Sequence, residues 1–119
     1  MNERHCAIGL GSNVGDRLFF LQRALARLSR LDGLRVIASS SIYESAAWGG
    51  QTDQAFLNAV VAGLTSLEPE ALLVEMQQIE EDFGRQREVK WGARTLDLDL
   101  LAVDDETRES EALTLPHPW

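Results

Sequence analysis

Two aspartates, Asp97 and Asp99, stand in a run where leucine and aspartate alternate from Leu96 to Leu100. Strict alternation predicts a half-buried β-strand, in which residues two apart share a face. The three leucines should then enter the core, while both carboxylates project side by side from the opposite face. Carboxylates held that close repel each other unless a positive group lies between them. A divalent ion such as Mg2+, bound also by substrate phosphates, would supply that charge. The alternative is an ordinary strand with a solvated acidic face.

The residues just upstream of this strand favour the metal-site interpretation. Arg94 offers a planar donor fork for phosphate, and Trp91 offers a flat stacking surface. Arg85 and Arg87 lie close by, so positive charge is concentrated beside the carboxylate pair in a chain whose net charge is −8. The alternative for the three arginines is a solvated basic loop.

Length and composition predict one domain over residues 1–119, because 119 residues with 45% hydrophobic and 25% charged side chains suffice for a single core. The negative net charge argues against binding to nucleic acid or to an anionic membrane surface. No apolar run reaches the length of a membrane span, and the N-terminus does not resemble a signal peptide. The single cysteine, Cys6, cannot form an internal disulfide. We expect a cytoplasmic protein, as a monomer or weak homodimer.

The rest of the chain predicts alternating strands and helices. Strands are expected over Cys6–Leu10, Leu34–Tyr43, Phe56–Leu64 and Leu96–Leu100. The first helix should begin after Asp16, as an N-cap, and the second should run from Pro69 to about Phe83. The apolar helix positions are expected to be Leu18, Leu21, Leu25 and Leu28 in the first, with Arg17, Arg23, Arg27 and Arg30 outside, and Leu73, Met76, Ile79 and Phe83 in the second. The order β-α-β-β-α-β predicts an α+β, ferredoxin-like sandwich: a four-stranded, mainly antiparallel sheet with two helices on one face.

Several motifs distributed along the chain carry a family resemblance. They are Gly9–Asn13, Ser40–Glu44, Phe56–Asn58, Ile79-Glu80, Gly84–Arg87, Trp91–Asp99 and Leu115–Pro118, in that order. With these motifs the chain resembles the 6-hydroxymethyl-7,8-dihydropterin pyrophosphokinases of folate biosynthesis, from residue 7 to residue 118.

The resemblance implies a magnesium-dependent diphosphotransferase that moves pyrophosphate from ATP to the hydroxymethyl group of a reduced pterin and releases AMP. It implies two Mg2+ ions, with Asp97 and Asp99 as the metal ligands. Arg85, Arg87 and Arg94 match the family's phosphate-binding and catalytic arginines. Gln77, Glu80, Arg94 and His117 match nucleotide-side positions, although a solvated helix face would also explain the first two and an idle terminal histidine the last.

The pterin side of the resemblance rests on Phe56 and Asn58, which should share one strand face. They match the family's stacking aromatic and the amide that binds the pterin edge, while the alternative for Asn58 is an amide bonded only to backbone. Ser45, Ala46, Trp48 and Trp91 match the remaining substrate-binding positions, with Ser45 where threonine is usual. Trp48 could equally be an exposed loop aromatic.

The chain departs from the family pattern at three places. Ala46-Ala47 replaces a pair of prolines, and Ala93 replaces another, which should leave both segments less preorganised. The sequence given stops at Trp119, so the domain is expected to lack the family's usual C-terminal extension. Two functions therefore stay open: a working pyrophosphokinase, or a weak or inactive paralogue that binds pterin or nucleotide.

Overall fold

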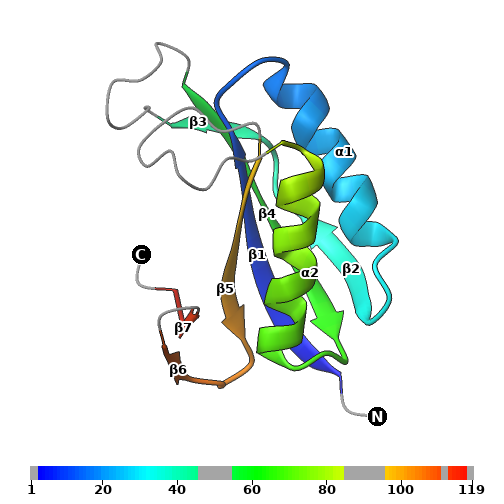
Figure 1. Ribbon diagram of the computed structural model, residues 1–119, viewed down its shortest axis with the longest axis vertical. Helices are drawn as coiled ribbons and strands as arrows, with labels where there is room; N and C mark the ends of the chain where they lie inside the picture. Colours follow the sequence, from blue (N-terminus) through cyan, green and yellow to red (C-terminus); the bar gives the residue numbers. More distant parts are fainter. Residues whose placement is uncertain (1–2, 46–54, 85–95, 111–112, 118–119) are drawn as a thin grey trace.

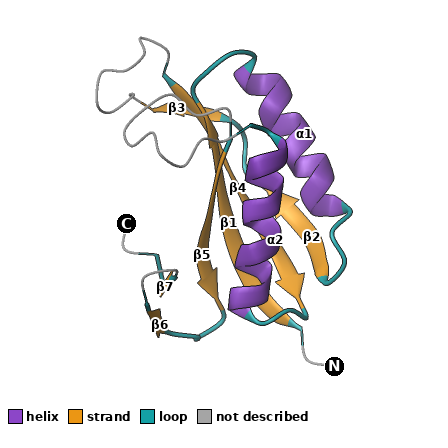
Figure 2. Cartoon of the chain, viewed as in Figure 1, coloured by secondary structure: helices purple, strands orange, loops and turns teal. Residues whose placement is uncertain are grey.

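Two helices lie on one face of a β-sheet in a computed structural model of the protein, shown in Figure 1. The structure describes residues 3–45, 55–84, 96–110 and 113–117. The helices are α1 (Arg17–Ser29) and α2 (Pro69–Asp82). The sheet contains β1 (Arg4–Ser12), β2 (Leu34–Ser39), β3 (Tyr43–Ser45), β4 (Phe56–Thr65) and β5 (Asp97–Val103). A small hairpin of β6 (Arg108–Glu109) and β7 (Thr114–Leu115) follows (Figure 2).

The strand order in the sheet is β2-β4-β1-β5, and β3 also pairs with β4. Every pairing is antiparallel. Strand β1 therefore lies between β4 and β5, and the two β-α-β halves of the chain interleave. This arrangement, with both helices on one face, confirms the predicted α+β, ferredoxin-like fold.

Both helices begin at the signals present in the sequence, and α2 also ends at one. The carboxylate of Asp16 accepts a hydrogen bond from the Phe19 N–H at 3.1 Å, which satisfies one of the unpaired donors at the start of α1. Pro69 occupies the first turn of α2, where its missing N–H costs nothing. Gly84, with a φ of +82°, follows the end of α2 in the left-handed conformation that favours glycine.

The core lies between the helices and the sheet. Leu96, Leu98 and Leu100 are buried there, as their alternation with aspartate predicts. The helix faces are rotated slightly from the prediction. In α1, Leu18 is 45% exposed and Ala24 is buried. In α2, Leu72 is buried and the predicted core residue Leu73 is only partly buried. Small alanine side chains carry little hydrophobic signal, so Ala24 was easy to overlook as a core position.

The prediction of one continuous edge strand over Leu34–Tyr43 is wrong. It is divided into β2 and β3, and β3 extends beyond the predicted end to Ser45. Ser39 pairs with Val61 and Tyr43 pairs with Asn58. Between these two pairs the edge segment contains one residue more than β4. At the break, Ser40 Oγ accepts from the Val60 N–H at 2.8 Å and so substitutes for a backbone partner.

The β6–β7 hairpin was not anticipated from the sequence. Leu113 and Leu115 are buried in the core, and the His117 N–H donates to the Leu101 carbonyl at 2.8 Å. The chain after β7 therefore lies along β5. Neither helix in the described part of the chain is long and apolar enough to cross a membrane.

Candidate functional site

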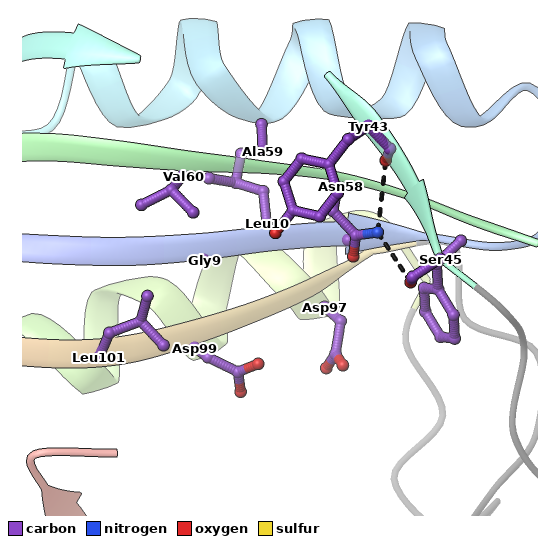
Figure 3. Close-up of a pocket in the computed structure, with 12 residues that line it drawn as sticks. Gly9, Leu10, Tyr43, Ser45, Asn58, Ala59, Val60, Asp97, Asp99 and Leu101 are labelled. Atoms are coloured by element: carbon purple, nitrogen blue, oxygen red, sulfur yellow. Dashed lines mark hydrogen bonds between the residues drawn. The ribbon is translucent and has the colours of Figure 1, made fainter. Parts of the chain in front are cut away.

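A cavity of about 440 Å3 lies on the face of the sheet opposite the helices (Figure 3). Its lining comes from four strands: the second half of β1, β3, the first half of β4, and β5. The lining residues are Gly9, Leu10, Gly11, Tyr43, Ser45, Phe56, Asn58, Ala59, Val60, Asp97, Asp99 and Leu101. Its volume falls within the range of pockets that hold small organic ligands.

The register of three adjacent strands defines the floor of this cavity. Gly11 of β1 pairs with Asn58 of β4 on one side and with Asp97 of β5 on the other. Asn58 and Asp97 are therefore two strand spacings apart, about 10 Å between backbones. A Cβ atom at Gly11 would lie 3.4 Å from both Asn58 Oδ1 and a Phe56 ring carbon. Glycine at this position keeps the floor between the amide and the carboxylates open.

The Asn58 amide is held in one orientation by β3. Its Nδ2 donates to Ser45 Oγ at 2.9 Å and lies 3.4 Å from the Tyr43 carbonyl oxygen (Figure 3). A carbonyl can only accept a hydrogen bond, so the nitrogen and not the oxygen must face Tyr43. Oδ1 is consequently directed over Gly11, where it can accept a hydrogen bond from a ligand donor.

Asp97 and Asp99 lie on the cavity face of β5, as the alternation predicts (Figure 3). His117 Nε2 lies 3.7 Å from Asp99 Oδ1, so the segment after β7 brings a third polar side chain to the pair. Among the described residues no cluster of three His, Cys, Asp or Glu side chains forms a metal cage. Mg2+ commonly binds through one or two carboxylates together with substrate phosphates and water, so the aspartate pair fits that ion in a complex with a polyphosphate.

The two predicted nucleotide-side residues of α2 do not line the cavity. Glu80 is only 3% exposed, so the solvated-face alternative is wrong for this residue. Its Oε2 accepts from the Leu98 N–H at 2.7 Å, and Leu98 stands between the two aspartates in the sequence. Glu80 therefore fixes the strand that carries the metal candidates. Gln77 is partly exposed on the same helix.

The structure brings together Ser45, Phe56, Asn58, Asp97 and Asp99, with His117 beside Asp99. The predicted residues Ala46, Trp48, Arg85, Arg87, Trp91 and Arg94 lie outside the described residues. Sequence reasoning missed the roles of Gly9, Gly11 and Tyr43 in the lining. Their contribution depends on the pairing of β1 and β3 with β4, which no local pattern encodes.

Comparison with known proteins identifies relatives along nearly the whole chain. Residues 7–119 match the model of the family described as 7,8-dihydro-6-hydroxymethylpterin-pyrophosphokinase. The chain is 40% identical over 112 residues to a 2-amino-4-hydroxy-6-hydroxymethyldihydropteridine pyrophosphokinase of Aquifex aeolicus. The aligned region covers 94% of this chain and 69% of that protein. Its identity to the protein of the same name from Bacillus subtilis is 48% over 111 residues, covering 93% of this chain and 66% of that protein.

The chain belongs to the 7,8-dihydro-6-hydroxymethylpterin-pyrophosphokinase family, because the family match extends over almost all of its length. A third relative, from Methylorubrum extorquens and also named as this pyrophosphokinase, is 43% identical over 92% of the chain. The chain spans about two thirds of the length of these relatives.

Proposed function

We propose that this chain transfers the terminal pyrophosphoryl group of ATP to the hydroxymethyl oxygen of 6-hydroxymethyl-7,8-dihydropterin. In this reaction the hydroxymethyl oxygen forms a bond to the β-phosphorus, and the bond from the β-phosphorus to the oxygen that bridges it to the α-phosphate breaks. AMP leaves, and the hydroxyl proton passes to water. The names of the relatives contain the hydroxymethyldihydropteridine and the pyrophosphokinase activity, and the arrangement of the site supports the proposal.

The observation that supports the proposal most directly is the register across β4, β1 and β5. An oriented amide, Asn58, and an aromatic ring, Phe56, lie on one side of the Gly11 floor, and Asp97 and Asp99 lie on the other. A planar ring bound against Asn58 Oδ1 would lie on the Gly11 floor, from which a short substituent can extend toward the carboxylates. The two sides of the cavity thus suit the two halves of the reaction, a ring with polar edges and a charged polyphosphate.

Asp97 and Asp99 are the residues we propose to hold magnesium, as two ions shared with the triphosphate. When bound, the ions would neutralise charge on the phosphate oxygens. The role of the aspartates is to present acceptor oxygens on a strand fixed by the buried leucines and by Glu80. Arg85, Arg87 and Arg94 are proposed to add positive charge on the phosphate side, where charge stabilisation supplies most of the catalysis in such transfers.

The test is AMP formation by the purified protein with MgATP and 6-hydroxymethyl-7,8-dihydropterin. We expect AMP to appear only when the pterin is present. Asp97→Asn and Asp99→Asn should each lower turnover by about 100-fold or more, because each removes a negative metal ligand. Both variants should keep the wild-type melting temperature, since neither side chain belongs to the core.

The matched control is Asp105→Asn, which removes an exposed carboxylate just beyond β5. This variant should retain normal turnover. Pterin and ATP binding without AMP formation would favour the paralogue that only binds. Near-normal turnover of either active-site variant at saturating magnesium would remove the metal role from that aspartate.

A further inference from the structure

Arg17, the first residue of α1, contacts the chain on both sides of residues 46–54. Its Nη1 donates to the Ala55 carbonyl oxygen at 2.7 Å and lies 3.5 Å from Glu44 Oε2. Glu44 lies in β3, and Ala55 immediately precedes β4. One guanidinium group therefore bridges the end of one strand and the start of the next, although the sequence predicted Arg17 to be a solvated residue on the outer helix face.

The contact to Ala55 is the stronger of the two. The Arg17 side chain is only 22% exposed, whereas that of Glu44 is 64% exposed. A charged donor in a partly buried hydrogen bond contributes more than an ion pair of 3.5 Å to an exposed carboxylate. Removing Arg17 should thus have larger consequences than neutralising Glu44.

The position of Arg17 in α1 is unfavourable for the helix itself. A helix N-terminus carries partial positive charge, so an arginine in the first turn of α1 does not favour the helix, although the carboxylate of the N-cap Asp16 precedes it. The contribution of Arg17 to the fold consequently lies in its contacts outside the helix. Replacing it should not weaken α1.

The bridged chain ends adjoin two residues of the cavity. Ser45 and Phe56 form the last pair of the β3–β4 ladder, and both line the cavity. Ser45 follows Glu44, Phe56 follows Ala55, and Ser45 Oγ accepts the hydrogen bond that orients Asn58. Strand β3 has only three residues, so its own ladder gives this pair limited support.

We propose that Arg17 is a positioning residue for the ring-binding side of the site. It holds the Ser45–Phe56 pair at the spacing that keeps the aromatic ring and the Asn58 amide ready for the pterin. Arg17 is not among the residues that line the cavity, so it acts through the strand ends and not by touching the ligand. The inference rests on the proposed function for the identity of the ligand, but the bridge itself can be tested separately.

The experiment compares Arg17→Ala, Arg17→Lys and Glu44→Gln with the matched control Arg23→Ala, an exposed arginine of the same helix. Steady-state AMP formation gives KM for each substrate. We expect Arg17→Ala to raise the pterin KM by about tenfold and to change the ATP KM by about twofold or less. In Glu44→Gln both KM values should change by about twofold or less. Arg17→Lys should be intermediate because the ammonium group keeps a charged donor but not the geometry of the guanidinium group. Arg23→Ala should match the wild type.

Amide hydrogen exchange tests the bridge without reference to activity. In Arg17→Ala, exchange should accelerate at Ser45 and Phe56 and remain unchanged at the β1–β5 pairs. Unchanged exchange would overturn the bridge, and an equal rise in both KM values with a lower melting temperature would show a general structural role instead. If the wild type makes no AMP, the proposed function fails, while the exchange result still decides whether Arg17 fixes these strand ends.

Discussion

At the scale of single residues, the orientation of Asn58 decides what the cavity can recognise. Nδ2 is directed to β3 by the Ser45 hydroxyl and the Tyr43 carbonyl. Oδ1 is left over Gly11 as an acceptor. A ligand with an N–H edge fits this arrangement, whereas a ligand that presents only acceptors would leave the amide oxygen unpaired, at a cost in affinity.

Asn58→Ala should therefore weaken pterin binding by about 1–3 kcal/mol while changing ATP binding little, because the ring edge loses its partner. Ser45→Ala should have a smaller effect of the same kind, since the amide stays but is no longer oriented. Calorimetric titration with each ligand measures both affinities. Equal weakening of the two ligands by Asn58→Ala would indicate that Asn58 only supports the strands.

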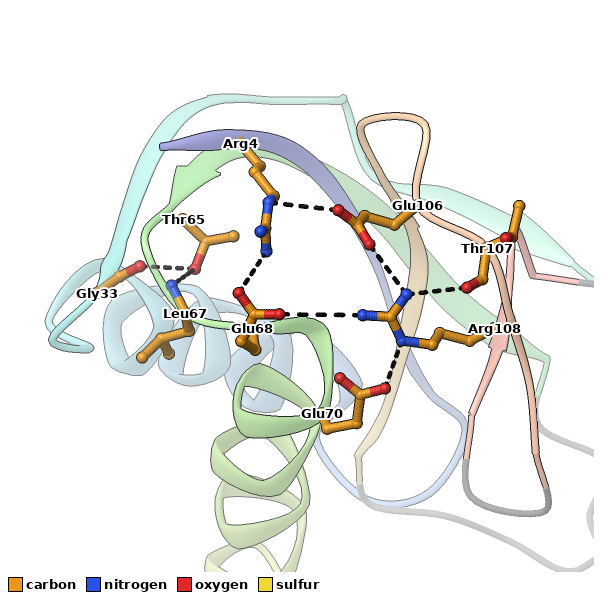
Figure 4. Close-up of polar contacts among 9 residues, drawn as sticks. All are labelled: Arg4, Gly33, Thr65, Leu67, Glu68, Glu70, Glu106, Thr107 and Arg108. Atoms are coloured by element: carbon orange, nitrogen blue, oxygen red, sulfur yellow. Dashed lines mark hydrogen bonds and ion pairs between the residues drawn. The ribbon is translucent and has the colours of Figure 1, made fainter. Parts of the chain in front are cut away.

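At the scale of elements, the β6–β7 hairpin is joined to the start of α2 by a network of charged side chains (Figure 4). Arg108 donates to Glu70 and to Glu106, and Arg4 pairs with Glu68 at 3.0 Å and Glu106 at 3.5 Å. The hairpin leads into the segment that carries His117 to Asp99. The network thus links the start of α2 to the hairpin that precedes His117.

The network should make the hairpin sensitive to acid. The hydrogen bond from Arg108 lowers the pKa of Glu70 below its ordinary value of 4.5. A lowered carboxyl pKa stabilises the fold fully above the ordinary value, and this contribution is lost as the pH falls through the lowered value. The melting temperature of Arg108→Ala should lie below that of the wild type at neutral pH.

The difference in melting temperature between wild type and Arg108→Ala should shrink as the pH is lowered past 4.5, where Glu70 begins to take up a proton in the unfolded chain. Arg35→Ala, which removes an exposed ion pair with Glu3, serves as the control. A difference that stays constant down to acidic pH would show that the Glu70 contact does not stabilise the hairpin.

At the scale of the whole molecule, the central strand β1 connects the core to the site. Its core face carries Cys6, Ile8 and Leu10, all buried, and its other face carries Gly9 and Gly11 on the cavity floor. Burial raises the pKa of the Cys6 thiol above its ordinary value of 9.0. Because β1 is paired on both sides, exposing Cys6 requires the sheet to open.

Cys6 should therefore report global unfolding. Alkylation at mildly alkaline pH should be at least about 100-fold slower in the native protein than in the urea-unfolded chain, since the buried thiol is both inaccessible and protonated. Mass spectrometry of the labelled fraction over time measures this rate. Native labelling at the unfolded rate would mean that β1 opens locally and that the sheet is not one cooperative unit.

The sequence by itself determined the order of the main helices and strands and the two faces of β5. The alternation from Leu96 to Leu100 assigns the leucines to the core and the aspartates to the cavity, because side chains of a strand alternate whatever the strand pairs with. Asp16 and Pro69 likewise set the helix starts, and the order of elements gives the ferredoxin-like topology. These properties depend on neighbours along the chain, which the sequence shows directly.

Only the tertiary structure decided the contacts between distant segments. The alignment of Asn58, Gly11 and Asp97, the division of the edge strand at Ser40, the buried carboxylate of Glu80 and the bridge made by Arg17 all depend on strand register and packing. A shift of one residue in either pairing would turn these side chains to other partners. Register is set by the sum of many weak contacts between segments far apart in the chain, and no local pattern records that sum.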